Sequence, residues 1–218
     1  MDEEIQILPI LAQPLFCSRH PDPDEITQLF ASHLKEENFS TNPRSENIKH
    51  YDQSKFLDQP EFEKFKQWIL DSALLFSSKI LLLTLEEDQP LIMTDYWLNQ
   101  IDKGGSLPPH NHANSLISGT YYLNHEENHS PLVFTQLRET ESNTINPYIR
   151  QQQDHNNIWT GDQVIQVKTG TLLLWESALV HGSYQNNADN RLSISFNIMP
   201  RILKDNTNAH KFEIVHLP

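Results

Sequence analysis

Two closely spaced histidines, His110 and His112, are the residues of this sequence whose types and spacing favour metal chemistry. Side chains alternate along an extended strand, so a His-x-His pair projects both imidazoles to the same face. His181 lies far downstream and follows the apolar run at residues 171–175, which is typical of a buried strand. Three imidazoles on one face leave three open positions on a metal, and imidazole is a good ligand for ferrous iron. The pattern predicts a mononuclear iron site formed by His110, His112 and His181.

Arg191 follows His181 after one short segment and opens the run Arg191-Leu192-Ser193. A guanidinium binds a carboxylate through two parallel hydrogen bonds, a geometry that lysine cannot match. On an extended strand Arg191 and Ser193 share a face, so the hydroxyl can contact the same carboxylate. The alternative is a surface arginine paired with an acid such as Asp189. Together with His181, the run favours a site that holds an acidic co-substrate.

These elements resemble the iron(II)/2-oxoglutarate-dependent oxygenase superfamily. In particular, they resemble a group of small oxygenases with a His-x-His pair, a Ser-Gly-x-Tyr-Tyr motif, a distal histidine and an Arg-x-Ser motif. In this chain the elements are His110-Asn111-His112, Ser118-Gly119-Thr120-Tyr121-Tyr122, His181 and Arg191-Leu192-Ser193. The resemblance covers roughly residues 96–197, and the N-terminal third of the chain is similar to the group only loosely.

The resemblance implies a double-stranded β-helix with His110 and His181 as iron ligands. It implies that Arg191 and Ser193 hold the distal carboxylate of 2-oxoglutarate, with molecular oxygen as the other co-substrate. The expected activity is that of a 2-oxoglutarate-dependent non-haem iron dioxygenase. Such an enzyme hydroxylates a small-molecule or peptidyl substrate, whose identity the sequence does not reveal.

His112 departs from the wider superfamily, which has Asp or Glu at this position. Three-histidine iron sites occur in thiol dioxygenases, which use no 2-oxoglutarate. A carboxylate from elsewhere in the chain is the alternative third ligand, and Glu176 and Asp102 are the candidates. We keep His112 as the third ligand.

Tyr121 and Tyr122 are adjacent on a predicted strand, so their side chains point to opposite faces. Both are candidates for binding the co-substrate through the phenol, but at most one of them can line the site. The other is expected to pack on a helix. Ser115 and Ser118 are candidates for hydrogen bonding to the metal ligands.

Two other functions compete with the oxygenase. The first is a cupin-type metalloprotein without 2-oxoglutarate: a three-histidine thiol dioxygenase, an isomerase or a sugar-binding module. Gly104 followed by His110-x-His112 matches the opening of the cupin pattern, but the glutamate expected soon afterwards is missing. Arg191 has no role in that scheme. The second is a non-catalytic interaction domain on a degenerate jelly roll, which gives no reason to keep three histidines and an arginine.

The elements that must position these residues are mainly β with flanking helices. Helix starts are predicted at Asp22-Pro23-Asp24-Glu25 and Asp58-Gln59-Pro60-Glu61, where a capping residue precedes proline and acid. Apolar residues then recur at helical spacing. Short strand-like runs follow at residues 91–98, 116–123, 131–134, 164–167, 171–175 and 192–199. This series predicts a double-stranded β-helix, a jelly-roll or cupin-like barrel, packed by the two helices.

We predict a single domain over residues 1–218. Residues 1–90 supply an N-terminal strand and supporting helices, residues 91–200 form the jelly-roll core, and residues 201–218 are a C-terminal extension. Residues 35–55 are polar and predict a loop. Residues 136–162 predict either a lid over the site or a surface loop.

Composition excludes several partners. The net charge is −13 and the basic residues are scattered, which argues against nucleic-acid binding. No apolar run approaches the roughly 20 residues that span a bilayer. The acidic start differs from a signal peptide, and Cys17 is the single cysteine, so we expect a cytoplasmic protein. Cys17 is predicted to be a small core residue, and His125 and His129 are predicted to be solvated. The sequence does not predict the oligomeric state.

Overall fold

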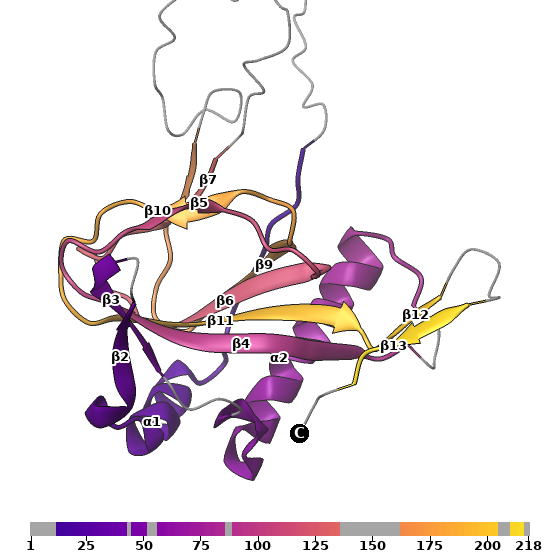
Figure 1. Cartoon of the computed structure of the whole chain (residues 1–218), viewed down its shortest axis with the longest axis horizontal. Coiled ribbons are helices and arrows are strands. Elements are labelled where there is room, and N and C mark those ends of the chain that lie inside the picture. The colour runs from indigo at the N-terminus through magenta and orange to yellow at the C-terminus, as the bar shows by residue number, and fades with distance from the viewer. Residues whose placement is uncertain are drawn as a thin grey trace, which may run out of the picture.

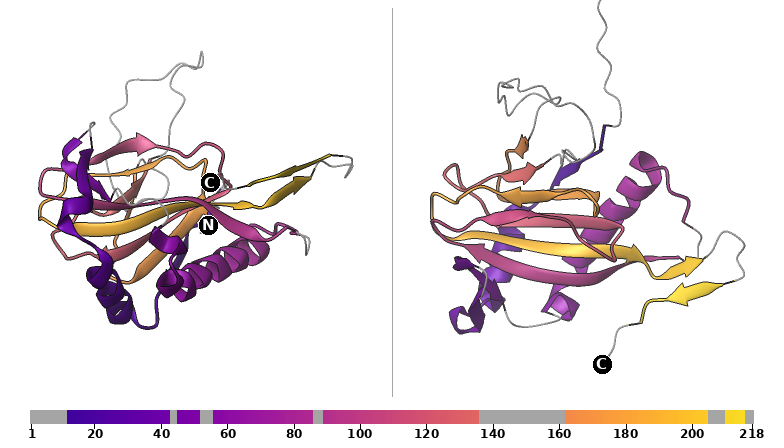
Figure 2. Two further views of the ribbon diagram at one scale, coloured as in Figure 1. Left: turned by 60° about the horizontal axis from the view of Figure 1, so that its bottom comes forward. Right: turned by 45° about the horizontal axis from the view of Figure 1, so that its top comes forward.

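The structure is a computed structural model that describes residues 12–42, 45–51, 56–85, 89–135, 162–204 and 210–215. Its elements form three layers (Figure 1). A small antiparallel sheet lies over a large antiparallel sheet, and two helices cover the opposite face of the large sheet. The same layering is visible from two further directions (Figure 2). The predicted arrangement of a β core with flanking helices is confirmed.

The large sheet has seven strands in the order β1-β9-β6-β11-β4-β3-β2. Its strands are β1 (Phe16–Arg19), β9 (Thr171–Glu176), β6 (Ile117–Asn124), β11 (Arg191–Pro200), β4 (Leu91–Ile101), β3 (Ser45–Tyr51) and β2 (Phe39–Asn42). The small sheet has the order β5-β10-β7-β8, formed by Leu107–His110, His181–Ser183, Leu132–Phe134 and Gln163–Ile165. The four central strands of the large sheet and the four of the small sheet face each other, as a jelly roll requires.

Two helices close the lower face of the large sheet. Helix α1 (Pro23–His33) begins where the sequence predicts, because the Asp22 side chain accepts a hydrogen bond from the Glu25 amide. Helix α2 (Glu63–Leu75) continues into a π-helical turn, η4 (Phe76–Ile80). The apolar faces of these helices and the lower face of the sheet form one buried core. Full burial of each large apolar side chain contributes roughly 1.5–3 kcal/mol to folding.

The second predicted helix start is wrong in detail. Asp58 ends a short 3-10 helix, η2 (Phe56–Asp58), and a further 3-10 turn, η3 (Pro60–Phe62), precedes α2. The helix therefore begins at Glu63, and no side chain caps it. Pro60 restricts the backbone of the 3-10 turn that precedes α2, whereas the sequence predicted this proline in the first turn of the helix itself.

The predicted loop at residues 35–55 is also wrong. A short 3-10 turn, η1 (Glu36–Asn38), leads into β2 and β3, which extend the large sheet beyond β4. β2 is the edge strand of the sheet and β3 lies between it and β4, and exposed polar residues on both strands make their composition resemble that of a loop. They matter for function, because β3 brings His50 to the cavity between the sheets.

Cys17 is exposed and not a core residue. Alternation along the edge strand β1 turns Phe16 toward the core of the helices and Cys17 to the other side. A hairpin of β12 (Ile202–Lys204) and β13 (Lys211–Glu213) projects from the end of the sheets (Figure 2).

The lid or loop predicted at residues 136–162 lies, apart from its last residue, outside the described residues. The domain bounds stay a prediction. Among the helices of the described segments, none combines the length and hydrophobicity of a membrane span.

Candidate metal centre

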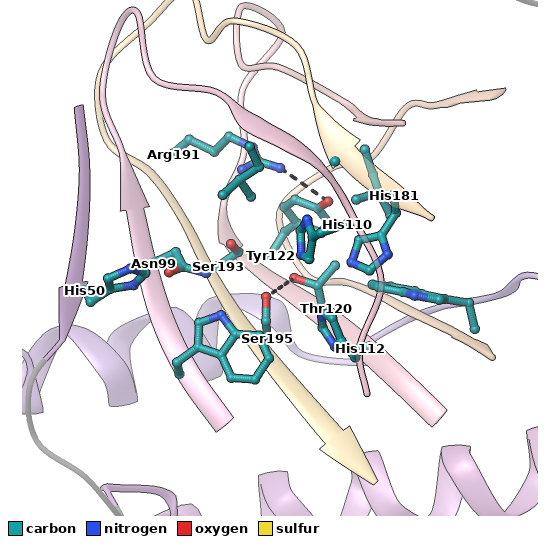
Figure 3. Close-up of a pocket in the computed structure, with 16 residues that line it drawn as sticks. His50, Asn99, His110, His112, Thr120, Tyr122, His181, Arg191, Ser193 and Ser195 are labelled. Atoms are coloured by element: carbon teal, nitrogen blue, oxygen red, sulfur yellow. Dashed lines mark hydrogen bonds between the residues drawn. The ribbon is translucent and has the colours of Figure 1, made fainter. Parts of the chain in front are cut away.

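Three histidine side chains meet between the two sheets. His181 opens β10 and pairs directly with His110, the last residue of β5. The ring centroids lie 4.5 Å apart for His110 and His181, 4.9 Å for His112 and His181, and 5.3 Å for His110 and His112. The nitrogens that could bind a metal all lie within 4.8 Å of one another. Figure 3 shows the three rings turned toward one another from separate segments of the chain.

His112 does not lie on a strand with His110, as the sequence predicted. It follows the end of β5, where its backbone amide donates to the carbonyl oxygen of Ser177 at 3.0 Å. The pair nevertheless shares one side of the cavity, because the chain stays close to the end of β9 after His110. The three-ring cluster therefore forms without the strand alternation that first suggested it.

Hydrogen bonds fix the tautomers of His110 and His181. The Nδ1 atom of His110 lies 2.9 Å from the carbonyl oxygen of Pro108, and that of His181 lies 2.9 Å from the carbonyl oxygen of Leu179. A carbonyl oxygen only accepts, so both Nδ1 atoms carry the proton. The lone pair then lies on Nε2, which leaves each ring ready to bind a metal.

His112 is held by side chains instead of backbone. Its Nδ1 atom lies 2.7 Å from Oδ1 of Asn197 on β11 and 2.9 Å from Oγ of Ser118 on β6. The Ser118 hydroxyl also lies 2.8 Å from Oγ of Ser177, whose hydroxyl donates to Ser115 at 2.8 Å. The linked hydroxyls of these serines help to orient the imidazole of His112, which does not lie on a strand. The expectation that Ser115 and Ser118 support the ligands agrees with these contacts.

Burial favours the neutral forms of His112 and His181. It lowers the pKa of His181 to about 4 and lowers the pKa of His112, against the hydrogen bonds that favour their protonated forms. A neutral imidazole has the free lone pair that a metal needs. Three nitrogens on one side of a site, with the other positions open, match the facial arrangement of non-haem iron centres.

The carboxylates considered as third ligands do not join the cluster. Within the described residues the group that could hold a metal consists of three histidines and no acid. Asp102 forms an ion pair with Lys49 at 3.2 Å and accepts from the Asn190 amide at 3.1 Å. Glu176 ends β9 without reaching the cluster. Neither acid belongs to this group, and His112 stays the predicted third ligand.

Arg191 is buried at the other end of the same cavity. It is 2% exposed and lines the cavity with the three histidines. Its Nη2 donates to the Tyr122 hydroxyl at 3.4 Å, its guanidinium carbon lies 5.3 Å from the Tyr122 ring centroid, and its buried Nε has no hydrogen-bond partner. The alternative of a surface pair with Asp189 is wrong, because Asp189 accepts from the Lys103 amide at 2.9 Å. No carboxylate forms an ion pair with Arg191 in the part of the chain that the structure describes, so the guanidinium is open to an anionic ligand.

The two tyrosines divide as their adjacent positions require. Tyr122 lines the cavity, and burial raises its pKa, which keeps the phenol protonated. Tyr121 faces the helices, where its ring centroid lies 4.9 Å from that of Phe65. Tyr121 is therefore corrected from a co-substrate contact to a core residue. Gly119, which precedes the two tyrosines on β6, has a packing role, because a Cβ there would lie 2.5 Å from the Phe196 ring.

The cavity has a volume of about 80 Å³ and includes residues that the sequence did not single out as ligands. Ser193 lines it as predicted, and Trp97, Asn99, Ser195 and His50 line it as well. The alternation of polar and apolar residues along 193–197 indicates that Ser193 and Ser195 share one face of a strand. It does not indicate which strands pair with β11, so it could not predict that β3 and β4 bring His50 and Asn99 to the same cavity.

His125 and His129 are buried, not solvated. The His125 ring contacts the Tyr122 ring edge to face with a centroid distance of 5.2 Å, and burial lowers the pKa of His125 to about 4. His129 lies 2.8 Å from the carbonyl oxygen of Asp189. Both residues sit in polar segments that fold back beneath Arg191, which local sequence could not indicate.

Comparisons with known proteins agree with this site. Residues 95–197 match the sequence model of the family described as "Putative 2OG-Fe(II) oxygenase". No curated protein sequence matches the chain. The structure is similar to that of HygX from Streptomyces hygroscopicus with nickel, 2-oxoglutarate and hygromycin B bound, with 15% identity and a TM-score of 0.57 over 86% of this chain and 83% of HygX.

Two further structures share the fold. The α-ketoglutarate-dependent epimerase SnoN from nogalamycin biosynthesis is 12% identical with a TM-score of 0.60, over 87% of this chain and 80% of SnoN. A Pseudomonas putida prolyl-4-hydroxylase is 12% identical with a TM-score of 0.56, over 87% of this chain and 94% of the hydroxylase. These similarities confirm the double-stranded β-helix. Residues 95–197 are similar to this family, whose description names both predicted cofactors, iron(II) and 2-oxoglutarate.

Proposed function

We propose that the protein is an iron(II)- and 2-oxoglutarate-dependent hydroxylase whose iron is held by His110, His112 and His181. One observation carries the proposal: three imidazoles converge at one end of a cavity, and a buried guanidinium that has no acidic partner among the described residues lies at the other end. A dicarboxylate co-substrate that chelates a metal at one end and ends in a free carboxylate matches both features. The three histidines alone, or the buried arginine alone, would favour this function less strongly than both do together.

The histidines are suited to hold iron in a fixed orientation. Their Nδ1 protons are engaged by Pro108, Leu179 and Asn197, so Nε2 of each ring faces the others. Such outer hydrogen bonds orient metal ligands and raise their basicity. When bound, iron and 2-oxoglutarate supply the oxidising power that uses molecular oxygen to hydroxylate a C–H bond, with succinate and carbon dioxide as co-products.

Arg191 and Ser193 are suited to hold the distal carboxylate. A buried arginine without an acidic partner is costly, and an incoming carboxylate offsets that cost. Ser193 lies on the same face of β11 and is 4% exposed, so its hydroxyl can donate to the same group. Tyr122 contacts the guanidinium from β6 and limits its motion.

Trp175 adds a further donor near the histidines. Its ring centroid lies 4.7 Å from that of His181, and its buried Nε1 has no hydrogen-bond partner among the described residues. An indole N–H only donates. The unpaired donors of Arg191 and Trp175 therefore both suit an anionic co-substrate, which offers only acceptors.

Two of the similar structures support the same cofactors. The HygX structure has nickel and 2-oxoglutarate bound, and a SnoN structure has Fe3+ and α-ketoglutarate bound. The cupin-type alternative, including a three-histidine thiol dioxygenase, gives Arg191 no ligand and has no support from these similarities. We therefore do not retain it.

Anaerobic titration tests the proposal. Addition of Fe(II) followed by 2-oxoglutarate should produce the weak visible charge-transfer band of a chelated keto acid. Arg191→Leu should weaken 2-oxoglutarate binding by about 100-fold while metal stoichiometry stays unchanged, because one charge-assisted contact is lost. Arg201→Leu is the matched control, because Arg201 is exposed and pairs with Glu213 away from the cavity. Equal 2-oxoglutarate affinity in wild type and Arg191→Leu would contradict the proposal.

A further inference from the structure

Beside Ser193, on the neighbouring strand β4, the cavity wall carries a buried polar group that the proposed chemistry does not use. Asn99 on β4 is 4% exposed and lines the cavity, and its Oδ1 has no hydrogen-bond partner among the described residues. A buried carboxamide oxygen without a partner destabilises the folded protein, because it has lost its hydrogen bonds to water. Buried polar groups in folded proteins are nearly always paired, so such an atom facing a cavity indicates a ligand.

Strand register places Asn99 beside Ser193, on the side that faces away from Tyr122. Ser193 on β11 pairs with Tyr122 of β6 on one side and with Asn99 of β4 on the other, and Asn99 in turn pairs with His50 of β3. The Arg191 guanidinium contacts Tyr122, so it reaches toward β6. Asn99 and His50 lie beyond β11, away from that contact (Figure 3). The four paired residues thus form a row across the sheet, with the contact between Tyr122 and Arg191 at one end and Asn99 and His50 at the other end.

Hydrogen-bond chemistry also assigns Asn99 to another ligand. Ionised 2-oxoglutarate offers only acceptors, whereas the unpaired Asn99 Oδ1 needs a donor. The ligand on this side must therefore present an N–H or O–H group. Water could supply it in the resting protein, but a substrate that enters the cavity displaces water and must replace its hydrogen bonds.

The charge of the cavity narrows the class of ligand. Arg191 is the one charged side chain among the described residues that line it, and the proposed co-substrate neutralises it. A cationic group would find no acid, and a second anion would find no second base. A neutral group with both a donor and an acceptor, such as an amide or a hydroxyl, fits the carboxamide of Asn99.

Trp97 and His50 complete this side. Trp97 lines the cavity, and its ring centroid lies 5.5 Å from that of the ligand His112, so it stands between Asn99 and the metal centre. Its indole provides an apolar wall. His50 Nε2 lies 2.8 Å from Nδ2 of Asn42, which only donates, so the neutral His50 ring carries its proton on Nδ1.

We propose that Asn99, with Trp97 and His50, recognises a neutral amide or hydroxyl group at the reacting end of the organic substrate. This inference rests on the proposed hydroxylase function and adds the substrate class. Asn99 thereby determines specificity, and Arg191 and the three histidines serve the co-substrate and the metal.

Ligand-observed NMR with matched probes tests the inference. The protein is loaded with Zn(II) and 2-oxoglutarate, which prevents turnover, and is titrated with phenylacetamide, 2-phenylethanol, phenylacetate and phenethylamine. Phenylacetamide or 2-phenylethanol should bind best, and the better of the two identifies the amide or hydroxyl source. Asn99→Leu should weaken binding of that probe by about tenfold. Asn99→Asp should shift the preference toward phenethylamine, because it places a carboxylate on the same wall.

Two measurements separate this role from others. Asn99→Leu should bind Zn(II) and 2-oxoglutarate as wild type does, and it should melt at the same or a higher temperature, because it removes an unpaired buried group. Gln100→Leu is the matched control, because Gln100 is adjacent on β4 and its side chain binds Asp102 outside the cavity. This control should leave probe binding unchanged.

The outcomes that overturn the inference are distinct from failure of the proposed function. Preference for phenylacetate or phenethylamine, unchanged probe affinity in Asn99→Leu, or weakened 2-oxoglutarate binding in that variant would each overturn it. Absence of probe binding to a protein that holds Zn(II) and 2-oxoglutarate would do the same. If wild type binds neither Zn(II) nor 2-oxoglutarate, the hydroxylase proposal itself fails.

Discussion

The two faces of the large sheet differ sharply although the same strands form both. On β11, Ile194, Phe196 and Ile198 point to the helices and are fully buried among apolar side chains. The alternate residues Ser193 and Ser195 point into the cavity (Figure 3). The side chains on the helix face pack against the two helices, and this packing excludes water. Among the described residues, the cavity face leaves Arg191 Nε, Asn99 Oδ1 and Trp175 Nε1 without a hydrogen-bond partner, and the helix face leaves the phenol oxygens of Tyr96 and Tyr121 without one.

This difference teaches how stability and function are divided in the molecule. The helix face supplies the apolar burial that stabilises the fold. That stability allows the cavity face to keep buried groups that cost free energy until ligands arrive. Substitutions on the two faces should therefore affect different measurements.

The largest effect is expected on the helix face. Phe196→Ala should lower the free energy of unfolding by about 3–5 kcal/mol, because it leaves a cavity next to Gly119 and Leu174. Denaturant titration measures this. Ser195→Ala, on the next residue and the opposite face, is the control and should change stability by less than about 1 kcal/mol. Equal losses in the two variants would mean that the faces do not divide as described.

The next effect is on the metal centre. His181→Ala should lower Zn(II) affinity by more than about 100-fold, because it removes one of three ligands, a larger change than the loss of a supporting hydrogen bond. Isothermal titration calorimetry measures the affinity. His33→Ala is the matched control, because His33 pairs with Glu61 on the helix side at 2.8 Å. Wild-type affinity in His181→Ala would remove His181 from the ligand set.

A smaller effect is expected at the residue that orients His112. Asn197→Ala should lower metal affinity by about 10–100-fold, because the Nδ1 proton loses its shortest contact and the ring can rotate. The three histidines remain, so one metal ion should still bind. The conservative variant Asn197→Asp should restore affinity, because a carboxylate also accepts from Nδ1. If Asn197→Ala binds metal as tightly as wild type, the hydroxyls of Ser118 and Ser177 suffice to hold the ring.

The smallest effect is a pH dependence beneath the cavity. Burial lowers the pKa of His125 to about 4 in the folded protein, below the ordinary value of 6.5. Between these values the unfolded chain binds more protons, so the free energy of unfolding should rise with pH from about 4 to about 6.5 and level off above. His125→Gln should make this rise less steep in urea titrations at several pH values. An identical slope in the variant would show that His125 is not protonated on unfolding.

Local patterns in the sequence sufficed for the metal ligands, Arg191 and the class of fold. His110, His112 and His181 are chemically distinctive, and the alternation of residues 193–198 directly predicts a strand with two different faces. The same alternation places Tyr121 and Tyr122 on opposite faces. Which tyrosine faces the cavity depends on the side that the helices cover, and no local pattern contains that information.

What the sequence did not predict depends on pairing between distant strands. The row of His50, Asn99, Ser193 and Tyr122 exists because β3, β4, β11 and β6 align in one register. The strand that bears His181 has only three residues, too few for a periodic signal. His125 and His129 become buried because a polar turn folds beneath Arg191. In each case tertiary context outweighs local composition.

X-ray absorption spectroscopy of the anaerobic Fe(II)-loaded protein tests the central claim most directly. The account predicts scattering from three imidazole rings, of which one is lost in His112→Ala. Two imidazoles in wild type with a carboxylate oxygen in the third protein position, unchanged by His112→Ala, would contradict it.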